Sequence, residues 1–402
     1  MTETELGQVL ALEVGAVAHG GHCVARADDG RVVFVRHTLP GERVRAEVTE
    51  ERTGYLRADA IEILRASPDR VTPPCRYAGP DLCGGCDFQH VSPAAQRDLK
   101  TAVVVEQLTR LARLNEHEID ALGVRVEPLP GGPLGWRTRL QYSIDSTGRA
   151  GLLKHRSHEV VAVDECAIAT PGVAAQSVTS EVWPDDDEVQ VVESGIGEVT
   201  VLAGSAGRTP HLVSGPPKIT EVVGEREWRL DPAAFWQVHP DAAATFVGVA
   251  MDLLAPAPGE HAWDLYGGAG IFAAALAERV GSGGSVTLVE SDHRALASAA
   301  ASLADLPWIT YVKSKVERVR LRVRPDVVVL DPPRSGAGAK VVTMLVEAAP
   351  RAIAYVACDP AALARDVATF RGLGYRLSAL RAYDAFPMTH HIECVALLEP
   401  GR

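Results

Sequence analysis

Short runs of alternating apolar and polar residues fill the first 65 positions of the chain. Turn sequences rich in Gly and Asp separate these runs, which lie at 10–14, 22–26, 31–36, 43–47 and 55–63. Alternation with a period of two indicates half-buried β-strands, and five short strands within about 60 residues favour a small closed barrel of the OB type. The pattern therefore predicts an N-terminal OB-like β-barrel over residues 1–66. A generic small barrel is the alternative.

The pattern changes twice more. After a Pro-rich joint, Ser92 and Pro93 carry the N-cap and first-turn signals of a helix that should run to residue 114, and short alternating strands follow from 136 to 230. We therefore expect a β-rich central domain over residues 67–230. From residue 231 onward, strand-like apolar runs alternate with Ala-rich helical segments. This alternation predicts an α/β domain over 231–402, with a doubly wound, Rossmann-like sheet of parallel strands.

The composition is that of an ordinary globular protein, with 47% hydrophobic and 23% charged residues among 402. It excludes a disordered, collagen-like or coiled-coil chain. Glu3 and Glu5 stand where a secretory signal needs positive charge, and no run of eighteen apolar residues occurs. We expect a cytoplasmic protein without a membrane span, in which thiols stay reduced.

A glycine-rich turn lies between the first strand of the last domain and its helix. The stretch Asp264-Leu-Tyr-Gly-Gly-Ala-Gly-Ile-Phe lets a backbone approach a ligand at the helix N-terminus. Glu290 ends the next strand, where a carboxylate can bind both hydroxyls of a ribose. NAD and S-adenosylmethionine both contain such a ribose, so the turn alone does not choose between them. A plain tight turn is the third possibility.

Three polar residues at later strand ends favour covalent chemistry on a pyrimidine. Asp331 begins Asp-Pro-Pro-Arg334, Cys358 lies in Ala-Cys-Asp-Pro, and Glu393 follows two histidines. A thiolate added to carbon 6 of uracil turns carbon 5 into a nucleophile for a methyl group, and a base must then remove the carbon-5 proton. Pro360 can start a helix, so we expect its N-terminus to lower the pKa of Cys358. A buried core cysteine is the alternative.

Three cysteines cluster in the central region with the spacing Cys75-x7-Cys83-x2-Cys86. A tetrahedral zinc site or an iron–sulfur cluster needs a fourth ligand, and Cys166 is the best candidate. Spacing alone does not decide between the two metals, and a structural role is the default interpretation. Cys23 and Cys394 are expected to be core residues. His390 and His391 are adjacent on a strand, so both cannot easily face one metal.

Together these motifs resemble the bacterial RNA (uracil-5-)-methyltransferases, which form 5-methyluridine in 23S rRNA or tRNA. The matching stretches run in order from residue 75 to 395: CGGCDFQH, the segment around Cys166, FWQVHP, DLYGGAGIF, DPPRSG, ACDP and HHIECV. Residues 6–64 resemble a TRAM domain, an OB-like RNA-binding module. The resemblance implies a class I methyltransferase sheet, and a helix near 93–120 that packs on the catalytic domain.

The resemblance also implies roles for individual residues. Cys358 matches the nucleophile and Glu393 the base. S-adenosyl-L-methionine would contact Gln237, Tyr266, Glu290 and Asp331, and a 4Fe-4S cluster would be held by Cys75, Cys83, Cys86 and Cys166.

The chain departs from the family pattern at three places. The first cysteine spacing is two residues longer than in well-known relatives, which makes Cys75 the least secure ligand. Ile271 stands where relatives often have asparagine, so a side-chain contact is lost. The stretch 314–317 matches weakly, and we assign no adenine contact there.

A net charge of −12 requires that RNA binding be local. Basic residues gather between Lys313 and Arg324, which we interpret as a solvated face, and again in the central region at Arg137, Arg139, Arg149, Lys154 and Arg156, the better RNA candidate. We expect a monomeric enzyme acting on a flipped uridine, in rRNA rather than tRNA. The alternatives are an NAD-dependent oxidoreductase and a non-enzymatic RNA-binding iron–sulfur protein.

Overall fold

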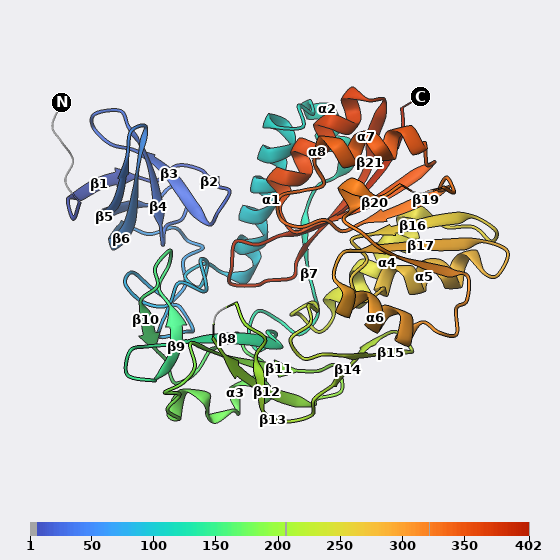
Figure 1. Cartoon of the computed structure of the whole chain (residues 1–402). Coiled ribbons are helices and arrows are strands. Elements are labelled where there is room, and N and C mark those ends of the chain that lie inside the picture. Colours follow the sequence, from blue (N-terminus) through green and yellow to red (C-terminus); the bar gives the residue numbers. More distant parts are fainter. Residues whose placement is uncertain (1–5, 206, 321, 402) are drawn as a thin grey trace.

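The computed structural model describes residues 6–205, 207–320 and 322–401. In these ranges the strands form a six-stranded N-terminal sheet, a six-stranded central sheet, a two-stranded hairpin and an eight-stranded C-terminal sheet. Figure 1 shows the N-terminal sheet (blue) and the C-terminal sheet on opposite sides of helix α1, with the central sheet (green) below them. The predicted boundaries at residues 66 and 230 stay predictions.

The N-terminal sheet contains all five predicted strands and one more, the two-residue β2. Its strand order is β1-β5-β6-β4-β3-β2, and β1 also lies close to β3, which brings distant parts of the sheet together. Inward-facing residues such as Val33, Val44 and Leu56 are fully buried, as the alternation predicts. The strands are β1 (Val9–Glu13), β2 (Val17–Ala18), β3 (His22–Arg26), β4 (Val32–Arg36), β5 (Arg43–Arg52) and β6 (Tyr55–Arg65).

Two helices follow the cysteine-rich segment, residues 75–88. Helix α1 (Pro93–Arg110) begins with Pro93 in its first turn, and α2 (Glu116–Leu122) begins with a reciprocal capping box between Asn115 and Glu118. Helix α1 therefore ends four residues before the predicted end at residue 114, and Arg113, in the connection to α2, adopts a left-handed conformation with φ 56°. Helix α1 packs against α8 (Pro360–Gly372) of the C-terminal part and against β2 of the N-terminal sheet.

The central region is built from an antiparallel sheet with the strand order β10-β9-β8-β11-β12-β13, followed by the hairpin β14-β15. Two short helices, α3 (Pro171–Ala174) and η1 (Ser177–Ser180), connect its halves. The strands are β8 (Arg139–Ile144), β9 (Ala150–Leu153), β10 (Val160–Ala162), β11 (Glu188–Glu193), β12 (Val199–Gly204), β13 (His211–Ser214), β14 (Ile219–Val223) and β15 (Arg226–Leu230).

The C-terminal sheet has the order β18-β17-β16-β19-β20-β22-β21-β7. Its first five members pair in parallel, as predicted, but β22 runs antiparallel to β20, so the expectation of parallel strands is wrong at this end. The short β7 (Val126–Pro128) comes from the preceding region and pairs in parallel with β21. The other strands are β16 (His261–Leu265), β17 (Ser285–Glu290), β18 (Ile309–Lys313), β19 (Val327–Leu330), β20 (Ala352–Ala357), β21 (Tyr375–Asp384) and β22 (Glu393–Pro400).

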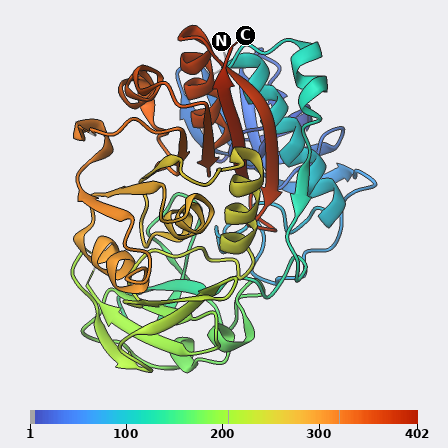
Figure 2. The same cartoon turned by 90° about the vertical axis from the view of Figure 1, so that its right-hand side faces the viewer.

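Helices cover both faces of this sheet. Apolar residues of α4, α5 and α6 form one buried cluster, and those of α1, α7 and α8 belong to another. Figure 2 shows the C-terminal strands (red) beside α1 (cyan). No helix in the described ranges is long and apolar enough to cross a membrane. The bounds are α4 (Ala242–Leu254), α5 (Ile271–Val280), α6 (His293–Ser302), η2 (Val316–Arg318), α7 (Gly338–Ala348) and α8 (Pro360–Gly372).

Candidate active site

The register of the parallel strands brings three of the predicted residues to one level. Leu265 pairs with Val289 and with Leu330, so the next residues, Tyr266, Glu290 and Asp331, lie side by side across the carboxyl edge of the sheet. Ligands of doubly wound sheets bind in the crevice at this edge. Local sequence places each residue at a strand end, and strand pairing then brings them together.

The glycine-rich turn is held against Glu290. The backbone N–H of Gly268 donates to Oε2 of Glu290 at 3.0 Å, and the N–H of Asp292 donates to Oε1 at 2.7 Å. The N–H and the hydroxyl of Ser291 also donate to Oε1, so Oε2, which has one partner, is the oxygen that keeps an acceptor position for a ribose hydroxyl. Gly270 has φ 85°, and a Cβ there would lie 2.9 Å from Leu303, so this position requires glycine.

Cys358 and Glu393 lie at neighbouring strand ends. In the antiparallel pair β20–β22, Ala357 is opposite Cys394, and one step further Cys358 falls opposite Glu393. Pro360 starts α8 as predicted, and the carboxylate of Asp359 caps this helix by accepting from the N–H of Ala362 at 2.7 Å. The nucleophile candidate is therefore fixed between a strand and a capped helix.

All six residues predicted for catalysis and cofactor binding line one pocket of about 590 Å³. Sequence reasoning missed two further lining residues of chemical interest. Phe235 is 79% exposed, although it stands in the FWQVHP motif, and Arg334 adds a positive charge beside the carboxylates. The six predicted residues are Gln237, Tyr266, Glu290, Asp331, Cys358 and Glu393.

Burial dominates the electrostatics of this pocket. Together with the carboxylates of Glu393 and Asp331, burial raises the pKa of Cys358 to about 11. The predicted lowering of this pKa by the helix N-terminus is therefore wrong. Burial also raises the pKa of Asp331 to about 7 and holds the pKa of Glu393 well above its usual range, so Glu393 has a strong affinity for a proton.

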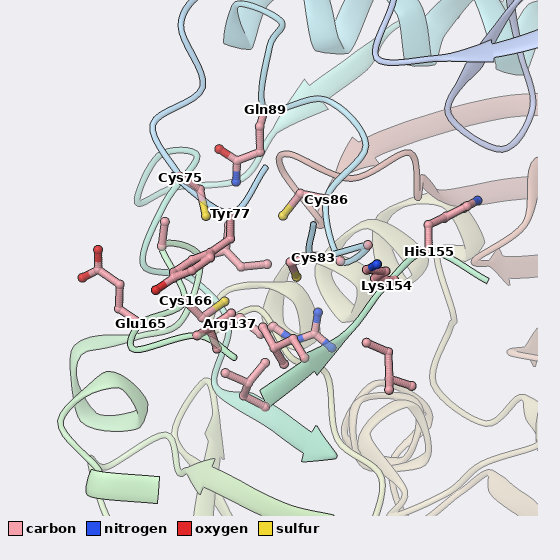
Figure 3. Close-up of a pocket in the computed structure, with 18 of the residues that line it drawn as sticks. Cys75, Tyr77, Cys83, Cys86, Gln89, Arg137, Lys154, His155, Glu165 and Cys166 are labelled. Carbon is pink, nitrogen blue, oxygen red and sulfur yellow. The ribbon is translucent and has the colours of Figure 1, made fainter. Parts of the chain in front are cut away.

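The four clustered cysteines also meet, in a second pocket of about 340 Å³. Figure 3 shows Cys75, Cys83, Cys86 and Cys166 around one shared space that Tyr77 also lines. All seven cysteines are free thiols, and Cys23 and Cys394 are buried core residues as expected.

Four thiols that line one pocket are a donor set that suits a tetrahedral zinc ion or an iron–sulfur cluster. Within the described residues, no group of three or more Cys, His, Asp or Glu side chains lies close enough to hold one metal ion. A zinc ion needs its four ligand atoms at about 2.3 Å, whereas the thiolates of a cluster bind separate irons and lie further apart.

Profiles of three protein families match the chain. The TRAM domain matches residues 3–61, the methyltransferase small domain matches 227–355, and the tRNA (uracil-5-)-methyltransferase family matches 315–400. An uncharacterized RNA methyltransferase of Streptomyces avermitilis is 47% identical over 98% of this chain and 99% of its own length. The chain belongs to the RNA (uracil-5-)-methyltransferase family. It is an S-adenosylmethionine-dependent RNA methyltransferase with an N-terminal TRAM domain.

Other comparisons agree with the family. An uncharacterized RNA methyltransferase of Corynebacterium efficiens is 34% identical over 97% of this chain and 94% of its own length. The crystal structure of a Pyrococcus abyssi tRNA (uracil-54, C5)-methyltransferase with S-adenosyl-L-homocysteine covers 96% of this chain and 99% of that chain, with a TM-score of 0.70 and 22% identity. At this identity it shows the same fold. The family excludes the oxidoreductase and non-enzymatic alternatives.

A groove of the methyltransferase lies between the TRAM sheet and the central region. Phe34 and Tyr55 have ring centroids 5.3 Å apart, and the Arg57 guanidinium lies over both rings. Phe34 and Arg57 line this groove of about 580 Å³ together with Lys154 and Arg156. Acidic residues line it too, and Glu159 pairs with Lys154 at 2.7 Å. Aromatic faces beside cations are typical of single-stranded RNA sites.

One residue of the predicted basic stretch does not fit an RNA role. Arg139 is buried and its Nη2 lies 3.0 Å from Oε1 of Glu221, so its charge is neutralised inside the protein. In the other basic stretch, Lys313 to Arg324, the basic residues that the structure describes are exposed. This exposure agrees with the interpretation as a solvated face. In the stretch 314–317, where we assigned no adenine contact, Glu317 accepts a hydrogen bond from the hydroxyl of Tyr266 at 3.2 Å.

Proposed function

We propose that this methyltransferase converts a uridine in RNA to 5-methyluridine, with Cys358 as nucleophile and Glu393 as base. The observation that carries the proposal is their placement: β-sheet register sets Cys358 opposite Glu393, and both line the pocket that contains the ribose-binding candidate Glu290. A thiol and a buried carboxyl group facing one crevice supply the two functions that uracil carbon-5 methylation needs.

The protein residues act in sequence. The Cys358 thiolate adds to carbon 6, which breaks the 5,6 double bond and makes carbon 5 nucleophilic. S-adenosylmethionine, when bound, supplies the methyl group that carbon 5 accepts, and Gln237, Tyr266, Glu290 and Asp331 would hold it. Glu393 then takes the carbon-5 proton, the double bond reforms, and Cys358 leaves as a thiolate. The high proton affinity of the buried Glu393 suits this last transfer.

We also propose that Cys75, Cys83, Cys86 and Cys166 hold a 4Fe-4S cluster. When bound, the cluster would supply a structural crosslink between the segment before α1 and the loop after β10. The four thiols lining one pocket support this assignment. The readout is iron and acid-labile sulfide per chain, which Cys83→Ser should lower and the core variant Cys23→Ser should not.

For the substrate we propose 23S rRNA rather than tRNA. The TRAM domain and the groove beside it favour an unfolded or single-stranded RNA segment, whose exposed ring face a thiolate can reach. The name of the Pyrococcus abyssi structure gives tRNA as the substrate of that protein. Mapping 5-methyluridine in rRNA and tRNA of a deletion strain separates the two. Loss from tRNA alone would overturn the rRNA assignment.

RNA containing 5-fluorouridine tests the chemistry directly. Fluorine on carbon 5 cannot be removed as a proton, so a covalent, methylated protein–RNA adduct should accumulate when S-adenosylmethionine is present. Cys358→Ala should abolish this adduct, whereas Cys394→Ala, a neighbouring thiol that is fully buried, should keep it. Absence of an adduct with both rRNA and tRNA substrates would refute the proposed mechanism.

The base assignment needs a separate variant. Glu393→Gln should form the adduct on fluorinated RNA, because addition and methyl transfer do not need the base. On ordinary uridine RNA it should accumulate a covalent complex and release little product. Normal turnover by Glu393→Gln would contradict the base role.

A further inference from the structure

The loop that leads into Glu393 is held by the cysteine-rich segment rather than by the catalytic sheet alone. The carbonyl of Met388 accepts hydrogen bonds from the N–H groups of Asp87 at 3.0 Å and Phe88 at 2.9 Å. The side-chain amide of Gln96 in α1 accepts from the N–H of Met388 at 2.9 Å. Met388 itself has φ 67°, an unfavourable conformation for this residue, so these contacts hold the loop in place.

Asp87 makes the strongest of these contacts. Its Oδ2 lies 2.6 Å from Nδ1 of His390 and also accepts from the backbone N–H of His390 at 3.1 Å. The side chain is 6% exposed, and Arg36 of the TRAM sheet approaches its other oxygen at 4.0 Å. A Cβ at Gly21 would lie 2.8 Å from Cβ of Asp87, so the β2–β3 turn also packs on this residue. The mechanism above assigns Asp87 no role.

None of these contacts is made to Cys358; the same β2–β3 turn reaches only its neighbour Asp359, whose Oδ2 lies 3.0 Å from Nε2 of His19. Cys358 follows β20 and precedes α8, and the Asp359 cap fixes it there. Only two residues separate His390 from Glu393, and Ile392 before Glu393 is buried. A displacement of His390 would therefore move Glu393 while leaving Cys358 in place.

We propose that Asp87 is a positioning residue for the proton-removal step: its contact with His390 fixes the loop that places Glu393 opposite Cys358. The inference rests on the proposed function, because it requires Glu393 to act as the base. Asp87 touches neither substrate nor cofactor in this assignment. The TRAM sheet takes part in positioning the base through its turn and Arg36.

Two RNA probes separate proton removal from the earlier steps. The 5-fluorouridine RNA reports addition and methyl transfer, and uridine RNA reports the complete cycle. For Asp87→Ala we expect adduct formation on fluorinated RNA within about twofold of wild type, and turnover on uridine RNA lower by about tenfold or more, as loss of a charged hydrogen bond predicts. A covalent complex should persist on uridine RNA.

Conservative and matched variants complete the test. Asp87→Asn keeps an acceptor for His390 and should restore turnover to within about threefold of wild type. His390→Ala should reproduce the pattern of Asp87→Ala, which keeps the test valid if the latter does not fold. Asp69→Ala changes an exposed carboxylate shortly before the cysteine-rich segment and should have no effect.

The outcomes are distinct. Iron content and thermal melting of each variant show whether the cysteine site and the fold are intact. A parallel fall of adduct formation and turnover, or unchanged turnover in both Asp87→Ala and His390→Ala, would overturn the inference. If the wild-type protein forms no adduct on fluorinated RNA, the proposed function fails instead.

Discussion

The reactivity of Cys358 follows from its surroundings. Burial and two nearby carboxylates raise its pKa from 9.0 to about 11. Alkylation proceeds through the thiolate, whose fraction at pH 8 would be about 0.1% for this residue and about 10% for an unperturbed thiol. We therefore expect iodoacetamide to modify Cys358 about 100-fold more slowly than a free cysteine at pH 8.

Peptide mass spectrometry after timed alkylation checks this prediction site by site. The rate at Cys358 should rise by about tenfold for each pH unit between pH 8 and 10, because the thiolate fraction does so below the pKa. Glu393→Gln removes one of the carboxylates that raise the pKa, and should shift the profile to lower pH. Cys394, which is fully buried, is the internal control and should stay unmodified. A plateau already reached at pH 8 would refute the reasoning.

Three further predictions concern binding and stability. Glu290→Ala should weaken S-adenosylmethionine binding by about 10- to 100-fold in calorimetry, since charged hydrogen bonds contribute about 1.5–3 kcal/mol, while the exposed Glu278→Ala should not change it. Lys100→Met leaves the buried Asp384 without its ion-pair partner at 2.5 Å, and should lower the free energy of unfolding by about 3–5 kcal/mol in urea titrations. The double variant Lys100→Met with Asp384→Leu should regain most of this lost stability. The pKa of Asp264 is raised to about 8 by burial, so its neutral form favours the fold. Between about pH 4 and pH 8 the folded protein loses the advantage of binding that proton, so Asp264 should lower the stability by at most about 1.4 kcal/mol per pH unit. The raised pKa values of Asp331 and Glu393 add to the same fall. Asp264→Asn should therefore make the slope shallower, and an equally steep slope in the variant would contradict the assignment.

Much of the active site could be predicted because strand ends are visible in the sequence. Apolar runs mark the strands of a parallel sheet, and the polar residue after each run falls at the carboxyl edge. Glu290, Asp331 and Cys358 were placed this way, and all three line one pocket. Phe235 was missed because an exposed aromatic next to a buried one gives no periodic signal.

Other features depend on contacts between distant segments. The antiparallel β22 was expected to be parallel, because an apolar run has the same pattern in either direction. The three residues of β7 are too few to carry a strand signal, and they join the sheet only by pairing with β21. The end of α1 at Arg110 is hidden in an apolar periodicity that continues to Leu114.

The sequence by itself determined which residues stand at strand ends and helix caps, since period, turn chemistry and capping act over a few neighbouring positions. Tertiary structure alone decided how these residues behave. Burial beside Glu393 and Asp331 raises the pKa of Cys358, although its place before a helix predicts the opposite. The contact of Asp87 with His390 joins residues 303 positions apart. Desolvation and such pairings arise only when separate surfaces meet, and no local pattern encodes them.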